Sequence, residues 1–204
     1  MIDRTEAARD PEEARGPDRR WRITVLSLVP IVAVAALLGF GLGRNPSDVD
    51  NALVGTRAAA FALRDVHTGR TLRMSELRGH PVVLNFWASW CVPCIEEHAN
   101  LISAWQRFGD TGVVFLSVMF EDSPANAADF ERRWGAAGWP NLVDPGSRTA
   151  LDYGVRGVPE TFFIGPDGVI RAQHSGPVSY DIVAQDLAPL LKRSNPGMAA
   201  GAGP

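Results

Sequence analysis

The chain has 204 residues, of which 46% are hydrophobic and 21% are charged, and its formal net charge is −3. This length and composition suit one ordinary domain with a sizeable core, and the mildly acidic balance argues against a nucleic-acid partner. The two cysteines exclude a small disulfide scaffold, which needs several bridges. They leave half of a zinc site or one redox pair as the remaining possibilities.

The N-terminal part of the chain differs in composition from the rest. Residues 1–22 are rich in charges of both signs and poor in apolar side chains, so we expect a disordered cytoplasmic tail. Residues 23–42 carry no charge and are long enough to cross a bilayer as one helix, a setting that tolerates Pro30. A cleaved signal peptide is the alternative, but its apolar region is usually only ~7–15 residues long. The segment therefore predicts a single transmembrane anchor.

The charges beside residues 23–42 predict the orientation of this anchor. Four arginines lie between residues 15 and 22, whereas Arg44 stands alone after the apolar segment. Because positive residues stay on the cytoplasmic side, we expect the N-terminus in the cytoplasm and residues 44–204 on the periplasmic or other extracytoplasmic side. Disulfides can persist in such a compartment.

The exported part predicts alternating strands and helices. Residues 43–58 indicate a linker, and residues 61–79 a small hairpin around the turn-like HTGR. The apolar run at 81–90 is typical of a strand buried on both faces, and a helix is predicted over 92–108. The inner face of this helix is predicted to carry Cys94, His98, Leu101, Ile102, Trp105 and Phe108.

The remaining elements follow the same alternation. We expect a strand at 112–120, a helix at 123–138 with Ser123 as its N-cap, a short strand at 139–144, a small helix at 147–154, two strands within 155–176 joined at PDG, and an amphipathic helix at 179–193. The tail, 194–204, is predicted to be disordered. This order indicates one α/β domain over residues 59–193, with helices on both faces of its sheet.

The cysteines Cys91 and Cys94 lie between the predicted strand and helix, within WCVPC. With His98 they supply three metal ligands, whereas a closed structural zinc site needs four. A covalent haem site needs histidine directly after the second cysteine, and Ile95 stands there. We therefore expect neither a metal nor another cofactor.

A reactive dithiol fits this position better. Cys91 lies where the helix begins, and the free N–H groups and helix dipole there lower a thiol pKa. Cys94 follows one helical turn later, close enough to close a disulfide. Farther along, Pro159 in GVP precedes the apolar TFFI; on its own it is most simply a loop proline that opens a strand.

Three motifs together carry a resemblance that covers residues 53–192. In order along the chain, NFWASWCVPC, GVPETFF and GPDGVI resemble the membrane-anchored thioredoxin-like proteins of the TlpA, ResA and CcmG (DsbE) types. CIEEH and VPET point within this group to the CcmG type of cytochrome c maturation. The resemblance implies a thioredoxin-like fold with a central mixed sheet, and a cis peptide bond at Pro159 beside the dithiol.

The resemblance also assigns roles to individual residues. Cys91 is implied to form a mixed disulfide with a client, which Cys94 then resolves. Glu97 and Glu160 are implied to tune thiol pKa values and proton transfer. Asn85 stands where thioredoxin has a buried aspartate, and because asparagine cannot accept a proton at neutral pH, that base is missing. The acids left nearby are Glu97, Glu160 and Glu96.

The implied function is reduction of disulfides outside the cytoplasm. The resemblance implies a membrane thiol–disulfide transporter of the DsbD/CcdA type as the electron donor. The implied client is the disulfide of an apocytochrome c CxxCH motif, or another thiol protein.

Three alternatives differ from this function. A peroxiredoxin-type peroxidase requires threonine three residues before its attacking cysteine, where this chain has Ala88. A TlpA-like reductase serving copper-site or oxidase assembly, or general disulfide reduction, stays open. So does a redox-inert metal chaperone that uses Cys91, Cys94 and His98 as soft ligands.

Overall fold

The computed structural model describes residues 29–30, 32–34, 36 and 52–194. The described residues within the predicted anchor are helical, while the other residues of 23–42, the predicted N-terminal tail and residues 195–204 lie outside the described part. Among the described residues, no helix is both long enough and apolar enough to span a membrane. The sheet and the helices that pack on it are formed by residues 52–194.

The core of the fold is one seven-stranded sheet with strand order β2-β1-β5-β4-β3-β6-β7. Its strands are β1 (Ala62–Asp65), β2 (Thr71–Arg73), β3 (Val82–Trp87), β4 (Val114–Met119), β5 (Asn141–Val143), β6 (Glu160–Ile164) and β7 (Ile170–Ser175). The central strands β3, β4 and β5 run parallel, whereas β6, β7, β1 and β2 pair antiparallel to their neighbours. The mixed sheet predicted from the sequence is confirmed.

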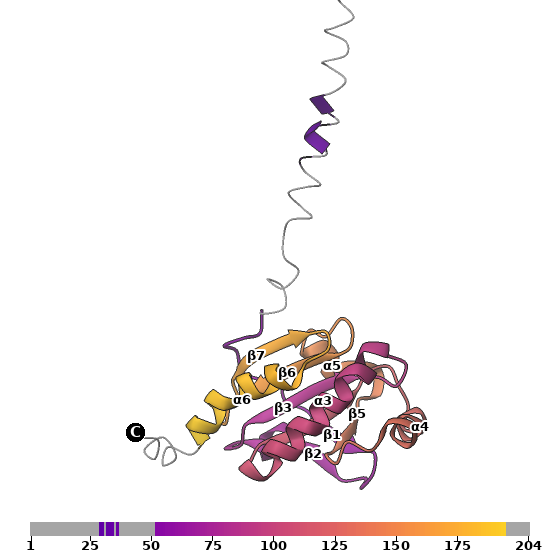
Figure 1. The fold of residues 1–204 in the computed structure, drawn as a ribbon, viewed down its shortest axis with the longest axis vertical. Helices are drawn as coiled ribbons and strands as arrows, with labels where there is room; N and C mark the ends of the chain where they lie inside the picture. Colours follow the sequence, from indigo (N-terminus) through magenta and orange to yellow (C-terminus); the bar gives the residue numbers. More distant parts are fainter. Residues whose placement is uncertain (1–28, 31, 35, 37–51, 195–204) are drawn as a thin grey trace, which may run out of the picture. The chain divides into compact units, whose positions relative to one another are not determined.

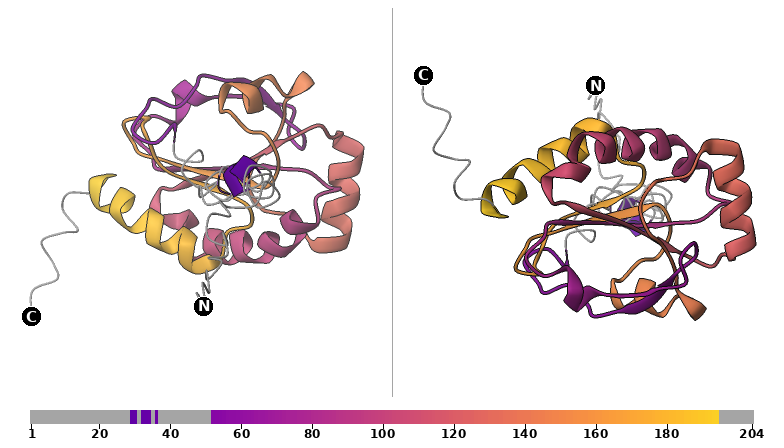
Figure 2. Two further views of the ribbon diagram at one scale, coloured as in Figure 1. Left: turned by 90° about the horizontal axis from the view of Figure 1, so that it is seen from above. Right: turned by 90° about the horizontal axis from the view of Figure 1, so that it is seen from below.

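Helices cover both faces of this sheet (Figures 1 and 2). They are α3 (Val92–Phe108), α4 (Pro124–Trp134), α5 (Arg148–Asp152) and α6 (Tyr180–Ser194). Figure 2 shows α3 and α6 along one face and α5 on the opposite face. The alternation of side chains along β3 explains this layering, because successive strand residues point to opposite faces. Val82, Leu84 and Phe86 join one core, while Val83 packs into the other with the α3 residue Leu101.

One predicted strand and one predicted helix end earlier than expected, and part of the predicted linker pairs with the domain. The strand expected to reach residue 90 ends at Trp87, because Cys91 N–H donates to the Ala88 carbonyl at 3.2 Å and turns the chain. The helix expected to reach 138 ends at Trp134, where Gly135 adopts a positive φ of 95° that favours glycine. Residues 55–58, placed in a linker because of its turn residues, hydrogen-bond with Gly168 and with Ile170, the first residue of β7.

The inner face of α3 differs from the predicted one. The buried residues are Cys94, Glu97, Leu101 and Ala104, whereas His98, Ile102, Trp105 and Phe108 are only half-buried. The helix is rotated so that a carboxyl group points inward. Glu97 can occupy this position because two N–H groups donate to its carboxylate, and a buried polar group with hydrogen-bond partners costs far less than one without them.

Candidate active site

Cys91 lies at the junction between β3 and α3. It is the N-cap residue of a 17-residue helix, with extended backbone angles of φ −85° and ψ 109°. Its Sγ accepts a hydrogen bond from the Cys94 backbone N–H at 3.1 Å, and the two cysteines form a disulfide with Cα atoms 5.3 Å apart. A sulfur at an N-cap faces free N–H groups and the positive end of the helix dipole. This position favours the thiolate of Cys91 once the disulfide is reduced.

The loop before β6 borders the dithiol from the other side. The Val158–Pro159 peptide bond is cis, and the Val158 carbonyl oxygen lies 3.4 Å from Cys91 Sγ. The sequence separation between these two residues is 67. The chain reversal between α5 and β6 therefore brings the predicted Pro159 to the cysteine pair.

Both cysteines are buried, whereas the two chain neighbours of Cys91 are exposed apolar residues. Cys91 and Cys94 are each only 3% exposed, whereas Trp90 is 56% and Val92 64% exposed. Large apolar side chains rarely stand in water without a function when they gather in one place. Trp90 and Val92 therefore present apolar surface next to the buried Cys91.

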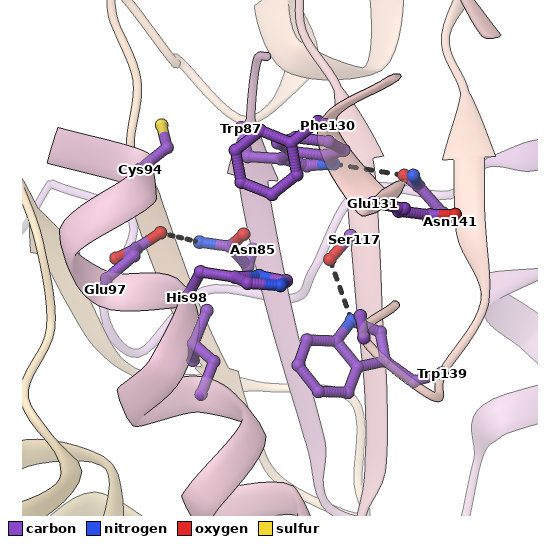
Figure 3. A pocket seen from close by; sticks show the side chains of 12 residues that line it. Asn85, Trp87, Cys94, Glu97, His98, Ser117, Phe130, Glu131, Trp139 and Asn141 are labelled. Atoms are coloured by element: carbon purple, nitrogen blue, oxygen red, sulfur yellow. Dashed lines mark hydrogen bonds between the residues drawn. The ribbon is translucent and has the colours of Figure 1, made fainter. Parts of the chain in front are cut away.

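Glu97 lies one helical turn after Cys94 and is 1% exposed. Figure 3 shows its carboxylate extending from α3 toward Asn85 on β3. Asn85 Nδ2 donates to Oε1 at 2.8 Å, and the Val178 N–H donates to Oε2 at 3.0 Å. Burial raises the pKa of Glu97 to about 7, although both hydrogen bonds act in the opposite direction. Glu97 can therefore gain or lose a proton near neutral pH.

Glu97 and the second cysteine line the same small cavity. Its volume is about 20 Å³, and Cys94, Glu97 and Asn85 contribute to its wall (Figure 3). A polar cavity needs roughly 10–15 Å³ to hold one water molecule. The space is therefore large enough for a single water molecule in the cavity that Cys94 and Glu97 share.

Glu160 lies beside Pro159 at the beginning of β6 and is 5% exposed. Gln173, on the neighbouring strand β7, donates from Nε2 to Glu160 Oε1 at 2.6 Å. Together with Val158 and Pro159, these two residues line a groove of about 510 Å³. The two predicted acids therefore line different cavities: Glu160 belongs to this groove, whereas Glu97 lines the small cavity that includes Cys94. Glu96, the third acid, is exposed.

His98 is engaged with the protein rather than directed at the cysteines. Its Nε2 donates to the Gly135 carbonyl at 2.9 Å, and its ring packs edge-on against Phe130 at a centroid distance of 5.0 Å. Within the part of the chain that the structure describes, no group of three or more histidine, cysteine or acidic side chains is arranged to hold a metal ion. These contacts account for the position of the His98 ring.

Sequence reasoning missed the partners that hold the predicted residues. Asn85, identified only as the replacement for a missing base, donates to Glu97 and also to Thr161 Oγ1 at 3.1 Å. The pairing of β3 with β6 sets Asn85 directly opposite Thr161. A reliable strand register was the signal that could have revealed this contact. The sequence alone did not provide it.

Comparison with known proteins agrees with this geometry. The AhpC/TSA family matches residues 54–173. The thiol:disulfide interchange protein DsbE of Allochromatium vinosum is 33% identical, over 84% of this chain and 95% of that protein. HelX of Rhodobacter capsulatus, also a thiol:disulfide interchange protein, is 34% identical over 81% of this chain and 95% of its own length.

Solved structures show the same relationship. A putative thiol:disulfide interchange protein DsbE from Chlorobium tepidum superposes with a TM-score of 0.62 and 29% identity, covering 68% of this chain and 97% of the other. At the position three residues before Cys91, the buried Ala88 lacks the hydroxyl that a peroxiredoxin-type peroxidase requires. The chain therefore belongs to the AhpC/TSA family of thioredoxin-like proteins, among the thiol–disulfide oxidoreductases of the DsbE/HelX (CcmG) type.

Proposed function

We propose that this oxidoreductase works as a reductant outside the cytoplasm and delivers two electrons to the disulfide of an apocytochrome c haem-binding motif. The hydrogen bond from the Cys94 N–H to Cys91 Sγ carries the proposal, because it marks the sulfur that the helix stabilises as a thiolate. The resemblance of the chain to proteins of cytochrome c maturation supports the choice of client.

The exchange proceeds in two steps. The Cys91 thiolate attacks one sulfur of the client disulfide, forming a mixed disulfide and releasing the other client sulfur as a thiolate. Cys94 then loses its proton and attacks Cys91 Sγ, which releases the second client sulfur. Both client thiolates take up protons, so the client gains two electrons and two protons while Cys91 and Cys94 become a disulfide.

Glu97 is the proton acceptor that we assign to the second step. Cys94 is buried, so a group inside the protein is better placed than bulk water to accept its proton. Glu97 lines the same cavity and has a pKa of about 7, which suits a group that exchanges protons at neutral pH. Glu97 thus acts as the proton acceptor for Cys94. The Asn85 side chain cannot take this role, because an amide does not accept a proton at neutral pH.

The groove beside Pro159 is the proposed binding site for the client polypeptide. Its volume of about 510 Å³ accommodates several residues of an extended chain, and Glu160 contributes a carboxyl group to its wall. The Val158 carbonyl, 3.4 Å from Cys91 Sγ, is the acceptor that we assign to a client backbone N–H. Glu160, held by Gln173, is assigned to the client side of the reaction.

The location of the protein follows from the N-terminal sequence. We place the catalytic domain on the periplasmic side of the cytoplasmic membrane, held by residues 23–42 as a single-pass anchor with a cytoplasmic N-terminus. A membrane thiol–disulfide transporter of the DsbD/CcdA type would return Cys91 and Cys94 to the reduced state. The two tails keep the bounds predicted from the sequence as part of this proposal. The linker is shortened, because residues 55–58 pair with residues 168–170 and are counted with the catalytic domain.

Trapping the client tests the proposed function. In cells, the Cys94→Ser variant is expected to accumulate a mixed disulfide between Cys91 and its client, because the resolving thiol is absent. Non-reducing electrophoresis followed by mass spectrometry would identify the trapped protein, with the Cys91→Ser/Cys94→Ser double variant as the control. An apocytochrome c supports the proposal. Copper-site proteins would shift the assignment to the TlpA-like alternative, and capture of no thiol protein would count against exchange altogether.

The reduction potential tests the direction of electron flow. A reductant in an oxidising compartment needs a low potential, so we expect a value near the ~−270 mV of thioredoxin and well below the ~−120 mV of the oxidant DsbA. Equilibration with defined ratios of reduced and oxidised dithiothreitol, followed by fluorescence of Trp90 and its neighbours, measures this value. A potential close to that of DsbA would instead assign the protein to disulfide formation.

A further inference from the structure

The turn that carries Cys91 is tied to the connection between β4 and α4. Asp122 in this connection is half-buried, and its Oδ2 accepts the Ser89 backbone N–H at 2.6 Å. Its other oxygen, Oδ1, accepts from the Ser123 N–H at 2.7 Å and from Asn126 Nδ2 at 2.8 Å. One carboxylate therefore links the turn before Cys91 to the first residues of α4.

The residue before Asp122 provides a second link to the same turn. The Glu121 carbonyl accepts a hydrogen bond from Trp90 Nε1 at 3.3 Å. Glu121 has a φ of 46°, which is uncommon for a residue other than glycine, and its N–H donates to Ser147 Oγ at 3.2 Å. The adjacent residues Glu121 and Asp122 thus hold the adjacent residues Trp90 and Ser89.

The charge on Asp122 is maintained by these contacts. Burial acts to raise the pKa of Asp122, but the hydrogen bonds from Ser89, Asn126 and Ser123 outweigh it and leave the pKa below its ordinary value. Asp122 is therefore ionised at neutral pH, and hydrogen bonds to a carboxylate are stronger than those between neutral groups.

We propose that Asp122 is a positioning residue for Cys91: by holding the Ser89 N–H it fixes the turn at residues 88–91 and keeps Cys91 Sγ at the N-terminus of α3. The Cys91 N–H donates to Ala88 within this turn, and Cys91 Sγ accepts from Cys94 at 3.1 Å. A turn released from Asp122 lets the sulfur leave the N-cap position, where the helix favours its thiolate.

Two alternative roles for Asp122 lead to different expectations. If its charge acts on Cys91 only through space, a nearby negative charge disfavours the thiolate, so removing the charge would lower the thiol pKa. If Asp122 only stabilises the beginning of α4, its loss would change the melting temperature and leave Cys91 unaffected. Of the three roles, only positioning predicts that loss of the Asp122–Ser89 hydrogen bond raises the pKa of the Cys91 thiol.

The pH dependence of Cys91 alkylation separates these cases. The full-length chain, reduced and carrying Cys94→Ser so that Cys91 is its only thiol, is treated with iodoacetamide across a pH series. Asp122→Ala is expected to raise the midpoint of the alkylation profile by about one pH unit, the size of a lost hydrogen bond expressed as a pKa shift. Asp122→Glu, which keeps the charge but displaces both oxygens, is expected to raise it as well.

Ser123→Ala is the matched control. It removes the N-cap hydrogen bond that Ser123 Oγ accepts from the Asn126 N–H, yet leaves the Asp122–Ser89 contact in place. We expect it to lower the melting temperature without moving the alkylation midpoint. A lower midpoint in Asp122→Ala with no change in Asp122→Glu would overturn positioning in favour of charge. Unchanged midpoints in both Asp122 variants would overturn it in favour of a purely structural role.

The positioning role rests on the proposed attack by Cys91, but its failure is distinguishable from failure of the proposed function. Alkylation measures the Cys91 thiol with no client present, whereas trapping measures whether a client reacts. Cys94→Ser could capture its client while the Asp122 variants leave the alkylation midpoint unchanged. That result would remove Asp122 from the mechanism and leave the exchange intact.

Discussion

Replacing Cys91 with serine is expected to reduce the rate of client-disulfide reduction on the order of 1000-fold or more, because the attacking sulfur is lost. Cys94→Ser should still perform the first attack and then stop as a mixed disulfide. Burial does not distinguish the two cysteines, since each is 3% exposed. The distinction comes from the N-cap hydrogen bond that Cys91 Sγ accepts from Cys94. Stopped-flow reduction of a disulfide-bonded CxxCH peptide, monitored by release of its first thiol, measures both effects.

The single-turnover form of this experiment separates attack from resolution. Reduced wild-type protein should release two thiols per molecule of peptide, Cys94→Ser one and Cys91→Ser none. Circular dichroism of each variant shows whether the fold is intact. If Cys91→Ser released one thiol and Cys94→Ser none, the roles of the two cysteines would be reversed. The Cys91 N-cap position would then have no part in selecting the nucleophile.

Local sequence pattern was sufficient for most of the fold. The run that forms β3 is apolar on both faces, and Cys91 directly precedes a helix whose first turn contains Pro93. These features depend on residues within one or two turns of each other, which periodicity and capping preferences describe well. The placement of Cys91 at a helix N-terminus could therefore be predicted from the amino-acid sequence.

The inward face of α3 could not be predicted in the same way. Cys94 and Leu101 are separated by seven residues, and both Glu97 and His98 lie between them at helical spacing. Because histidine is less polar than a carboxylate, the hydrophobic pattern placed His98, and not Glu97, on the buried face of the helix. The choice was decided by donors from elsewhere in the chain: Asn85 lies 12 residues and Val178 lies 81 residues from Glu97. Such partners become neighbours only through the sheet register and the packing of the loop before α6.

The same limit applies to Asp122. Its contact with Ser89 spans 33 residues and joins two loops that have no periodic pattern. The sequence shows an acidic residue before an N-cap serine, which is an ordinary beginning for a helix. Only the parallel pairing of β3 with β4, which brings the ends of both strands to one edge, places Asp122 beside the turn that leads to Cys91.

Glu97 also makes a prediction for stability. Its pKa is raised from 4.5 to about 7, so between these values the folded protein binds more protons than the unfolded chain. The free energy of unfolding must therefore fall as the pH rises from 4.5 to 7. Outside this range, Glu97 contributes little to its pH dependence. A shift of this size corresponds to roughly 3 kcal/mol in the free energy of unfolding. Glu97→Gln should lose this component of the pH dependence.

Urea denaturation at a series of pH values measures the difference between the two proteins. We expect the free energy of unfolding of the wild type, relative to Glu97→Gln, to decrease by roughly 3 kcal/mol from pH 4.5 to pH 7. Glu96→Gln is the matched control, because Glu96 is the adjacent but exposed acid on the same helix. Its curve should remain parallel to that of the wild type. Parallel curves for Glu97→Gln would show that Glu97 titrates normally.

The same substitution should impair the resolving step. In the wild type, ionised Glu97 accepts the Cys94 proton, so release of the second client thiol should accelerate as the pH rises through about 7. Glutamine cannot accept this proton, and loss of a general base typically slows a step by about 100-fold or more. Glu97→Gln should therefore leave the first thiol release unchanged, slow the second about 100-fold at pH 7.5, and remove its inflection near pH 7. If both releases slowed equally, Glu97 would act on Cys91 or on the fold rather than on deprotonation of Cys94.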